Sequence, residues 1–227
     1  MMQLILPGLR MALDKNSLAE LYAKRARLYD LSANAYYLLG FREFAYRKAA
    51  IRALNLKRGD TVVEIGCGTG LNFSGLIDCI GPEGKLIGVD LTAEMLSGAA
   101  HRARRNSWTN VELVRQDAAT YLFPERVDGI LSTFALTLIP EYDEIIKNGV
   151  AALGPRKRFV ILDFKEPEQW PSWLIHFFVT ITRPFGVSLD LTARHPWESL
   201  ARHAESLEFH ELYFGAVYLC VGAKHGH

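Results

Sequence analysis

Three glycines in five residues follow a short β-branched run and precede a stretch of helical character. Gly66, Gly68 and Gly70 come directly after residues 61–65, which read Thr-Val-Val-Glu-Ile and predict a strand. Glycine tolerates the left-handed backbone of a tight turn and lets a ligand lie against main-chain atoms. A strand, a glycine turn and a helix in this order are typical of the ligand-binding edge of an open α/β sheet.

Strand-like runs alternate with helical stretches through the middle of the chain. The expected strands cover residues 61–65, 85–90, 111–115, 127–132 and 158–164. The expected helices start near residue 71 and cover residues 92–105 and 142–153. This alternation predicts right-handed crossovers and a parallel sheet with helices on both faces. Residues 208–214 and 216–222, joined at Gly215, predict an antiparallel hairpin at the sheet edge.

The remaining segments are expected to cover this core. Residues 1–54 are interpreted as an N-terminal helical cap, and residues 55–227 as the core domain. An insert at about residues 168–206, after the fifth strand, is rich in Trp and Phe and is expected to form an aromatic lid. The predicted fold is therefore α/β, with a Rossmann-like, mostly parallel sheet of seven strands.

Composition limits the function classes. The chain has 227 residues and is 49% hydrophobic, which suits one domain with a large core. Its 26 basic and 25 acidic residues give no electrostatic footprint for nucleic acid. The three cysteines have no paired spacing and predict reduced thiols, so no metal is expected. No run approaches the ~20 apolar residues of a membrane span. A cytoplasmic location is expected, with peripheral contact at the inner membrane surface as an open alternative.

The glycine spacing distinguishes between ligands. A dinucleotide-binding turn needs G-x-G-x-x-G, whereas this turn reads G-x-G-x-G and continues with Leu71. Glu64 stands just before the first glycine. A carboxylate would repel a pyrophosphate but attract the ammonium of a methionine moiety, directly or through water. The turn therefore favours S-adenosylmethionine (SAM) over NAD or FAD.

Further candidate residues follow the second and third strands. Asp90 ends the second strand, where a carboxylate can accept from both ribose hydroxyls. Leu91 and Met95 are expected to form apolar walls against the adenine. Asp117 would accept from the adenine amino group while the Ala118 N–H donates to a ring nitrogen. These signals lie at successive strand ends, where ligands bind in such sheets.

The segment from Glu64 to Gly70, with Asp90 and Asp117 in register, strongly resembles the class I SAM-dependent methyltransferases. The resemblance covers about residues 22–165. It implies a methyltransferase that converts SAM to S-adenosylhomocysteine. The predicted cofactor-binding set is Tyr22, Tyr29, Glu64, Gly66, Cys67, Gly68, Gly70, Asp90, Leu91, Met95, Asp117, Ala118, Ser132 and Thr133.

The N-terminal tyrosines enter through the same resemblance. Residues 22–30 are similar to the Tyr-rich segment that covers SAM in quinone and phospholipid methyltransferases. Tyr22 and Tyr29 lie seven residues apart, so on a helix they share a face. They are positioning candidates together with Thr133, and the alternative is that both tyrosines are core aromatics. No general base is identified.

Several charged residues have two interpretations. Arg42 and Arg47 are candidates for the SAM carboxylate, but a solvated face is the favoured interpretation. The basic run at residues 101–105 is also expected on a solvated face. His195 is a candidate base near the substrate mouth, with a surface or capping role favoured.

The acceptor is predicted from the variable segments. Residues 29–40 and 134–140 resemble bacterial enzymes that N-methylate a betaine-lipid headgroup and, less closely, the quinone C-methyltransferases. An amine needs only to arrive deprotonated, whereas a quinol ring carbon benefits from a base. The amine of a lipid headgroup is therefore the first expectation. A ubiquinone or menaquinone precursor, a small metabolite, and a SAM sensor or scaffold without turnover remain open alternatives.

Overall fold

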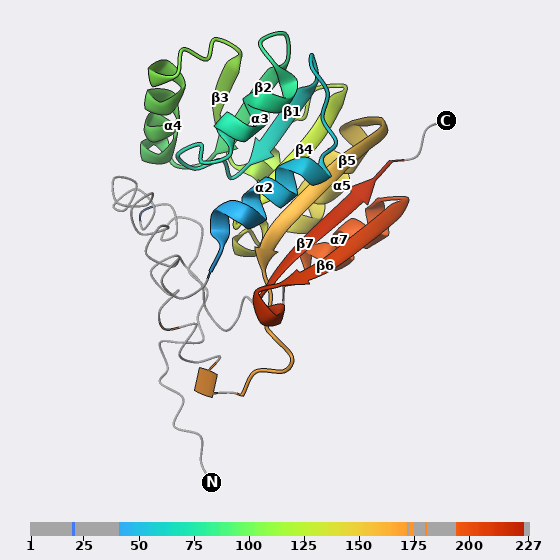
Figure 1. Ribbon diagram of the computed structural model, residues 1–227. Coiled ribbons are helices and arrows are strands. Elements are labelled where there is room, and N and C mark those ends of the chain that lie inside the picture. Colours follow the sequence, from blue (N-terminus) through green and yellow to red (C-terminus); the bar gives the residue numbers. More distant parts are fainter. Residues whose placement is uncertain (1–19, 21–40, 172, 175–179, 181–193, 225–227) are drawn as a thin grey trace.

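A single mixed sheet organises the part of the chain that the computed structural model describes, namely residues 20, 41–171, 173–174, 180 and 194–224 (Figure 1). Its strands are β1 (Thr61–Ile65), β2 (Lys85–Asp90), β3 (Val111–Arg115), β4 (Val127–Thr133), β5 (Leu153–Phe164), β6 (Ser206–Leu212) and β7 (Val217–Ala223). The helices are α2 (Glu43–Ala53), α3 (Phe73–Ile80), α4 (Ala93–Arg105), α5 (Tyr142–Ala152) and α7 (Pro196–His203). Short 3-10 turns are η3 (Ala118–Thr120), η4 (Leu136–Leu138) and η7 (Tyr213–Gly215).

The strand order confirms the predicted fold class. The seven-stranded sheet runs β3-β2-β1-β4-β5-β7-β6. Strands β1 to β5 pair in parallel, while β7 is antiparallel to both β5 and β6. The hairpin predicted near the C-terminus is therefore present, with β6 at the sheet edge. Because the first five strands are parallel, their carboxyl ends meet along one edge of the sheet.

Neighbouring residues of the strands bury opposite faces. Val62 packs in one hydrophobic cluster and Val63 in the other, as the two-residue period of a strand requires. Helices α2 and α3 contribute to the first cluster, and α5 and α7 to the second. Figure 1 shows α2 and α3 in front of the sheet and α5 and α7 behind it. Burial on both faces explains why β1 reads as a nearly continuous apolar run.

Helix α2 packs into the core. Its Ala50 and Ile51, and Leu54 just beyond its end, lie in the same hydrophobic cluster as Val62 of β1. The last part of the segment interpreted as a cap therefore forms one of the helical layers of the sheet. Residues 1–19 and 21–40, and residues 172, 175–179 and 181–193 of the predicted lid, lie outside the described residues, so the cap and the lid remain predictions.

Some predicted boundaries were wrong. β5 begins at Leu153 rather than at residue 158, because Leu153 pairs with Val127 before a register shift leads into the main ladder. The sequence conceals this start, since Gly154 and Pro155 are poor strand formers. α3 begins at Phe73 rather than near residue 71. None of the described helices is both long enough and apolar enough to cross a membrane.

Candidate cofactor site

A pocket opens where the carboxyl ends of the parallel strands meet. Its walls come from residues 66–69 after β1, 89–92 around the end of β2, 116–118 after β3 and 133–135 after β4. Arg47 of α2 and the apolar side chains of Leu71, Met95, Leu138 and Ile139 complete them. The pocket thus occupies the edge at which the sequence predicted a ligand.

The structure brings most of the predicted residues to this pocket. Those that line it are Gly66, Cys67, Gly68, Asp90, Leu91, Met95, Asp117, Ala118 and Thr133. Glu64, Gly70 and Ser132 do not line the pocket, although the prediction placed them in contact with the cofactor. Ser132 is fully buried because alternate side chains of β4 point away from the pocket. Tyr22 and Tyr29 lie outside the described residues.

The glycine turn needs its glycines for two different reasons. Gly66 has φ +66°, and a Cβ added there would lie 2.4 Å from the Cβ of Ala135. Gly68 has φ +54°, yet an added Cβ would meet nothing within 4 Å. Gly66 therefore allows the close approach of two chain segments, whereas Gly68 keeps space open at the pocket wall.

Asp90 ties the glycine turn to the end of β2. Its Oδ2 accepts from the Gly68 N–H at 2.9 Å and its Oδ1 from the Thr92 N–H at 2.9 Å. Burial raises the pKa of Asp90, while these backbone hydrogen bonds lower it. Each carboxylate oxygen has a second lone pair. Asp90 can therefore hold the turn and still accept from the two hydroxyls of a ribose.

Asp117 and Ala118 line the pocket directly after β3, and their predicted contacts with an adenine stay predictions. The Asp117 Oδ1 accepts from the Ala119 N–H at 3.0 Å and so caps the η3 turn. Ala118 follows at the pocket wall, and Met95 lies buried in the same wall with 2% of its surface exposed. This end of the pocket combines apolar walls with a carboxylate, as an adenine ring requires.

Arg47 corrects the expectation of a solvated face. Its side chain is buried, and its Nε donates to Glu43 Oε1 at 2.7 Å within α2. One of its terminal nitrogens donates to Thr133 Oγ1 at 2.6 Å. The guanidinium also lies 5.2 Å from the ring centroid of Phe134. Arg42, by contrast, is exposed, as expected.

A signal for this burial was present in the sequence. The buried positions of α2 include Glu43, Arg47, Ala50 and Ile51, which follow the spacing of one helical face. Arg47 therefore stands on the apolar stripe of the helix, with an acid four residues before it. A buried arginine needs such a partner, so the spacing could have identified the pair.

Asn72 is a site residue that the sequence analysis missed. It stands at the N-cap of α3, and its Nδ2 donates to Glu64 Oε1 at 2.6 Å and to Thr133 Oγ1 at 2.9 Å. Its Oδ1 accepts from Arg47 at 3.4 Å. Asn72 therefore connects the strand carboxylate, the end of β4 and the arginine of α2 in one buried network.

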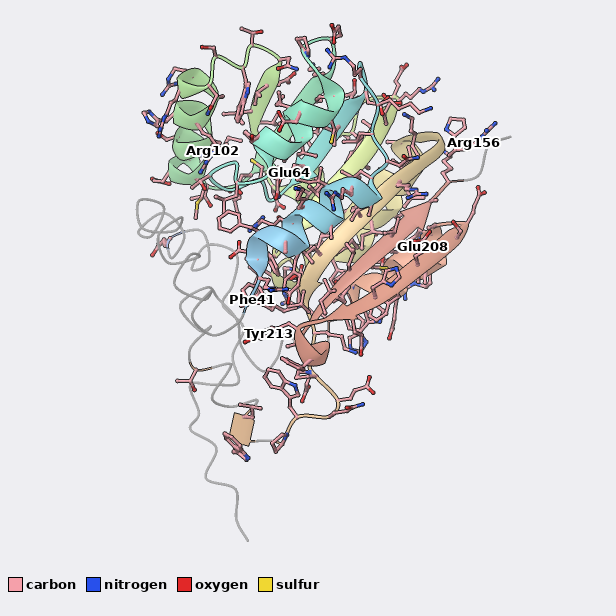
Figure 2. The ribbon with its side chains drawn as sticks, viewed as in Figure 1. Phe41, Glu64, Arg102, Arg156, Glu208 and Tyr213 are labelled. Carbon is pink, nitrogen blue, oxygen red and sulfur yellow. The ribbon has the colours of Figure 1, made fainter. Side chains whose placement is uncertain are left out.

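Glu64 lies behind the pocket wall, in the region of Figure 2 where α2 and α3 converge. It is 1% exposed, and its Oε2 has no hydrogen-bond partner among the described residues. Burial raises the pKa of Glu64 to about 7, although the Asn72 hydrogen bond and the charge of Arg47 lower it. Glu64 is thus an uncompensated buried acceptor beside the glycine turn.

Arg102 also differs from the solvated face predicted for the basic run. Its Nε donates to the main-chain oxygen of Thr69 at 2.9 Å, which links α4 to the glycine turn (Figure 2). Its neighbours His101, Arg104 and Arg105 are exposed, as predicted. One residue of the run therefore supports the pocket wall.

An aromatic cluster flanks the end of β4. The ring centroid of Phe134 lies 4.8 Å from that of Phe164 and 5.9 Å from that of Phe41. Phe41 also contacts Tyr213 at 5.3 Å, and Figure 2 shows both at the same end of the molecule. Phe134 has φ +56°, a conformation that is unfavourable for a bulky side chain. It is held there by a hydrogen bond from its N–H to the Leu162 oxygen at 2.7 Å.

His195 lies away from the pocket wall. It stands at the N-cap of α7, with its Nδ1 3.0 Å from Glu198 and its ring stacked on Trp197. This placement fits the favoured surface or capping role. Within the described parts of the chain, no three His, Cys, Asp or Glu side chains cluster as a metal site would need.

A comparison with protein families shows to which family the chain belongs. Residues 56–180 match the model of a family described as a methyltransferase domain. The chain belongs to this methyltransferase family. Its membership confirms the expected class I SAM-dependent methyltransferase, and with it an enzyme that takes SAM as its cofactor.

Curated relatives of the chain include demethylmenaquinone methyltransferases. A demethylmenaquinone methyltransferase from Geobacillus stearothermophilus is 26% identical over 138 residues, which are 60% of this chain and 59% of the relative. Another, from Listeria welshimeri, is 26% identical over 129 residues, which are 56% and 54% of the two chains. The chain thus matches just over half the length of these relatives.

Solved methyltransferases share the fold. A SAM-dependent methyltransferase from Aquifex aeolicus has a TM-score of 0.60 and 18% identity, covering 93% of this chain and 98% of its own. Phosphoethanolamine N-methyltransferase 2 of Haemonchus contortus, in complex with phosphomonomethylethanolamine and S-adenosylhomocysteine, has a TM-score of 0.67 and 15% identity. That match covers 90% of this chain and 59% of the other. At these identities the likeness shows the fold alone.

Proposed function

We propose that the protein transfers the methyl group of SAM to an apolar or amphipathic acceptor that enters beside Phe134. The observation that carries this proposal is the difference between the two ends of the pocket. Asp90 and Asp117 supply carboxylates at one end, whereas Phe134, Ala135 and Leu138 form an apolar wall at the other. The first end suits the adenosine of SAM. The methionine of SAM would then extend to Thr133, and the apolar wall that begins at Phe134 suits an apolar acceptor.

The chemistry asks little of the protein beyond positioning. The methyl group of a sulfonium is already activated, so transfer is an in-line displacement in which the acceptor atom attacks carbon as the sulfur leaves. The attacking electron pair forms the new bond, and the sulfur keeps the pair of the broken one. Aromatic faces near the sulfonium favour its charge.

The first candidate acceptor is the amine of a lipid headgroup. The carboxylates that line the pocket, Asp90 and Asp117, belong to the end assigned to adenosine. No described His, Lys, Glu or Tyr side chain lines the pocket, so the part of the wall beside Phe134 offers no general base. A neutral amine attacks with its own lone pair and releases its proton afterwards. N-methylation therefore agrees with the pocket, and the resemblance to betaine-lipid enzymes points to the same acceptor.

A ring carbon of a menaquinone precursor is the second candidate. Phe134 lines the pocket and offers a flat face to a flat substrate. The rings of Phe164 and Phe41 support it, since the three centroids lie within 6.1 Å of one another. The demethylmenaquinone methyltransferases among the relatives also favour this acceptor.

Peripheral contact with a membrane would bring either acceptor to the pocket. Phe214 is 83% exposed and Trp173 is 70% exposed. The Trp170 Nε1 donates to the Phe214 oxygen at 3.0 Å, which links the insert to the turn between β6 and β7. Large exposed aromatic side chains are typical of surfaces that meet lipid. Flotation with vesicles tests the contact: Phe214→Ala should reduce the bound fraction, while the exposed control Leu122→Ala should not.

Transfer of a labelled methyl group from SAM tests the function. The protein is incubated with labelled SAM and with separate lipid, quinone and polar-metabolite fractions, and S-adenosylhomocysteine release is measured in parallel. We expect label in the amine-lipid fraction. Label in the quinone fraction would select the second candidate. Label only in polar metabolites would contradict an apolar acceptor, and SAM binding without any product would indicate a sensor or scaffold.

A further inference from the structure

The Thr133 hydroxyl is left with only one kind of hydrogen bond to make. Its Oγ1 accepts from Arg47 at 2.6 Å and from Asn72 at 2.9 Å. A hydroxyl has two lone pairs and one proton. Because both lone pairs are used, Thr133 can bind a further group only by donating its proton. The structure gives this proton no protein acceptor among the residues that it describes, and Thr133 lines the pocket.

Arg47 brings a positive charge to the same place. It lines the pocket with 6% of its surface exposed, and Glu43 holds its Nε. Burying this charge is costly unless hydrogen bonds fix it in position. Two side chains supply those bonds, namely Glu43 of α2 and Asn72 at the start of α3. Arg47 and Thr133 therefore present a fixed cation and a directed hydroxyl proton side by side.

This pair of donors suits a carboxylate. A carboxylate is an acceptor-only group with two oxygens, and its hydrogen bonds to a guanidinium are among the strongest in proteins. The adenosine end of the pocket faces Asp90 and Asp117, so the amino-acid end of a bound SAM molecule would reach β4 and α2. That end carries the only carboxylate of SAM.

We propose that Arg47 and the Thr133 hydroxyl form a receptor for the α-carboxylate of SAM, with Glu43 and Asn72 as positioning residues. The proposal rests on the proposed function, because it assumes that SAM occupies this pocket. Such a receptor would make the protein prefer SAM over nucleosides that lack the carboxylate. A nucleoside without the carboxylate would leave the buried Thr133 proton without an acceptor beside the charge of Arg47, which costs more than the lost contact alone.

The test compares the binding of two ligands, SAM and decarboxylated SAM, in the wild type and in each variant. Dissociation constants for SAM and for decarboxylated SAM are measured by calorimetry with the wild type, Thr133→Val and Arg47→Met. We expect the wild type to prefer SAM by about 10- to 100-fold, since a hydrogen bond to a charged group contributes a factor of this order. Thr133→Val should reduce this preference and Arg47→Met should nearly remove it. Arg52→Met, an exposed arginine of the same helix, is the matched control and should keep it.

One further variant and the choice of valine at position 133 protect the test against misfolding. Arg47→Met leaves Glu43 unpaired, so the double variant with Glu43→Gln is measured beside it. Thr133→Val preserves the shape of the side chain and removes only the hydroxyl. Circular dichroism and thermal unfolding check that each variant is folded.

The outcomes separate the inference from the proposed function. If the wild type binds neither nucleoside, the proposed function fails. If it binds both, but Arg47→Met and Thr133→Val keep the wild-type preference for SAM over decarboxylated SAM, the carboxylate receptor is wrong while the proposed function stands.

Discussion

The two ends of the pocket are built in different ways. At the end assigned to adenosine, carboxylates bind main-chain groups two residues away, as Asp90 does with Thr92 and Asp117 with Ala119. At the end assigned to methionine, Thr133 accepts from residues 86 and 61 positions away in the chain, Arg47 and Asn72. Apart from the bond between Asp90 and the Gly68 N–H, the first, local end consists of contacts within single strand ends. The second, assembled end exists only when α2, α3 and β4 have packed together. Substitutions at the two ends should therefore have different effects on the affinities for SAM and for adenosine.

The largest effect is expected at the local end, from Asp90→Ala. The ribose loses its acceptor, and the Gly68 and Thr92 N–H groups lose theirs. We expect SAM affinity to fall by about 100-fold or more, since several hydrogen bonds to a charged group are lost together. Calorimetry measures the change, with the exposed Asp78→Ala of α3 as control. Unchanged affinity would show that the ribose lies elsewhere.

The glycine turn offers the next largest effect, through a pair of alanine variants. Gly68→Ala should weaken SAM binding at least about tenfold, because the new methyl group fills space kept for the ligand. Its left-handed backbone should cost about 1–2 kcal/mol of stability. Gly66→Ala should lower the melting temperature more, because its methyl group would overlap with Ala135. Equal melting temperatures, or normal SAM binding by Gly68→Ala, would contradict these roles.

Asn72→Ala should affect only the assembled end. It removes the donor that Glu64 and Thr133 share, so we expect SAM affinity to fall about tenfold. Adenosine lacks the methionine moiety, and its affinity should stay as in the wild type. Titrations with both ligands measure the contrast, and the exposed Asn148→Ala of α5 is the control. A parallel loss of adenosine affinity would mean that the two ends are not independent.

The smallest effect is a pH dependence that comes from Glu64. Its pKa in the folded, ligand-free protein is about 7, against an ordinary value of 4.5. The ammonium of SAM favours the ionised form of Glu64, so the Glu64 carboxyl group must lose its proton for tight binding. We expect SAM affinity to fall about threefold as the pH drops by one unit across this pKa. The decrease should be absent in Glu64→Gln, and an identical pH profile would exclude Glu64 as its source.

The same pKa predicts a change in the stability of the ligand-free protein. A carboxyl pKa that is raised on folding adds stability below the unfolded pKa, and this is lost as the pH rises through 7. Glu64→Gln should therefore gain stability relative to the wild type as the pH rises from 4.5 to about 7. Urea unfolding at several pH values measures the difference between the two proteins. A difference that does not vary with pH would contradict the raised pKa.

The sequence predicted the local end of the site because its signals are themselves local. Asp90 and Asp117 each follow a recognisable strand, and the spacing of the glycines separates this turn from a dinucleotide-binding one. The parallel pairing of the first five strands followed from the alternation of strands and helices. Signals of this kind need no knowledge of which distant segments meet.

The assembled end was harder to predict, for a physical reason. Asn72 looks like an ordinary helix cap in the sequence, and only the packing of α3 against β4 brings it to Thr133. Arg47 was expected in solvent because arginine is rarely buried without a partner. Its partner Glu43 lies four residues before it, but the meaning of that pair depends on α2 covering the sheet. Ser132 was predicted to bind the cofactor, but it is fully buried and does not line the pocket, because neighbouring residues of a strand face opposite sides.

A crystal structure with S-adenosylhomocysteine tests the central claim most directly, namely that one nucleoside spans two differently built ends of this pocket. The account predicts the ribose at Asp90, the adenine between Met95 and Ala118, and the carboxylate against Arg47 and Thr133. A nucleoside bound outside the pocket, or one whose carboxylate points away from α2, would contradict the account.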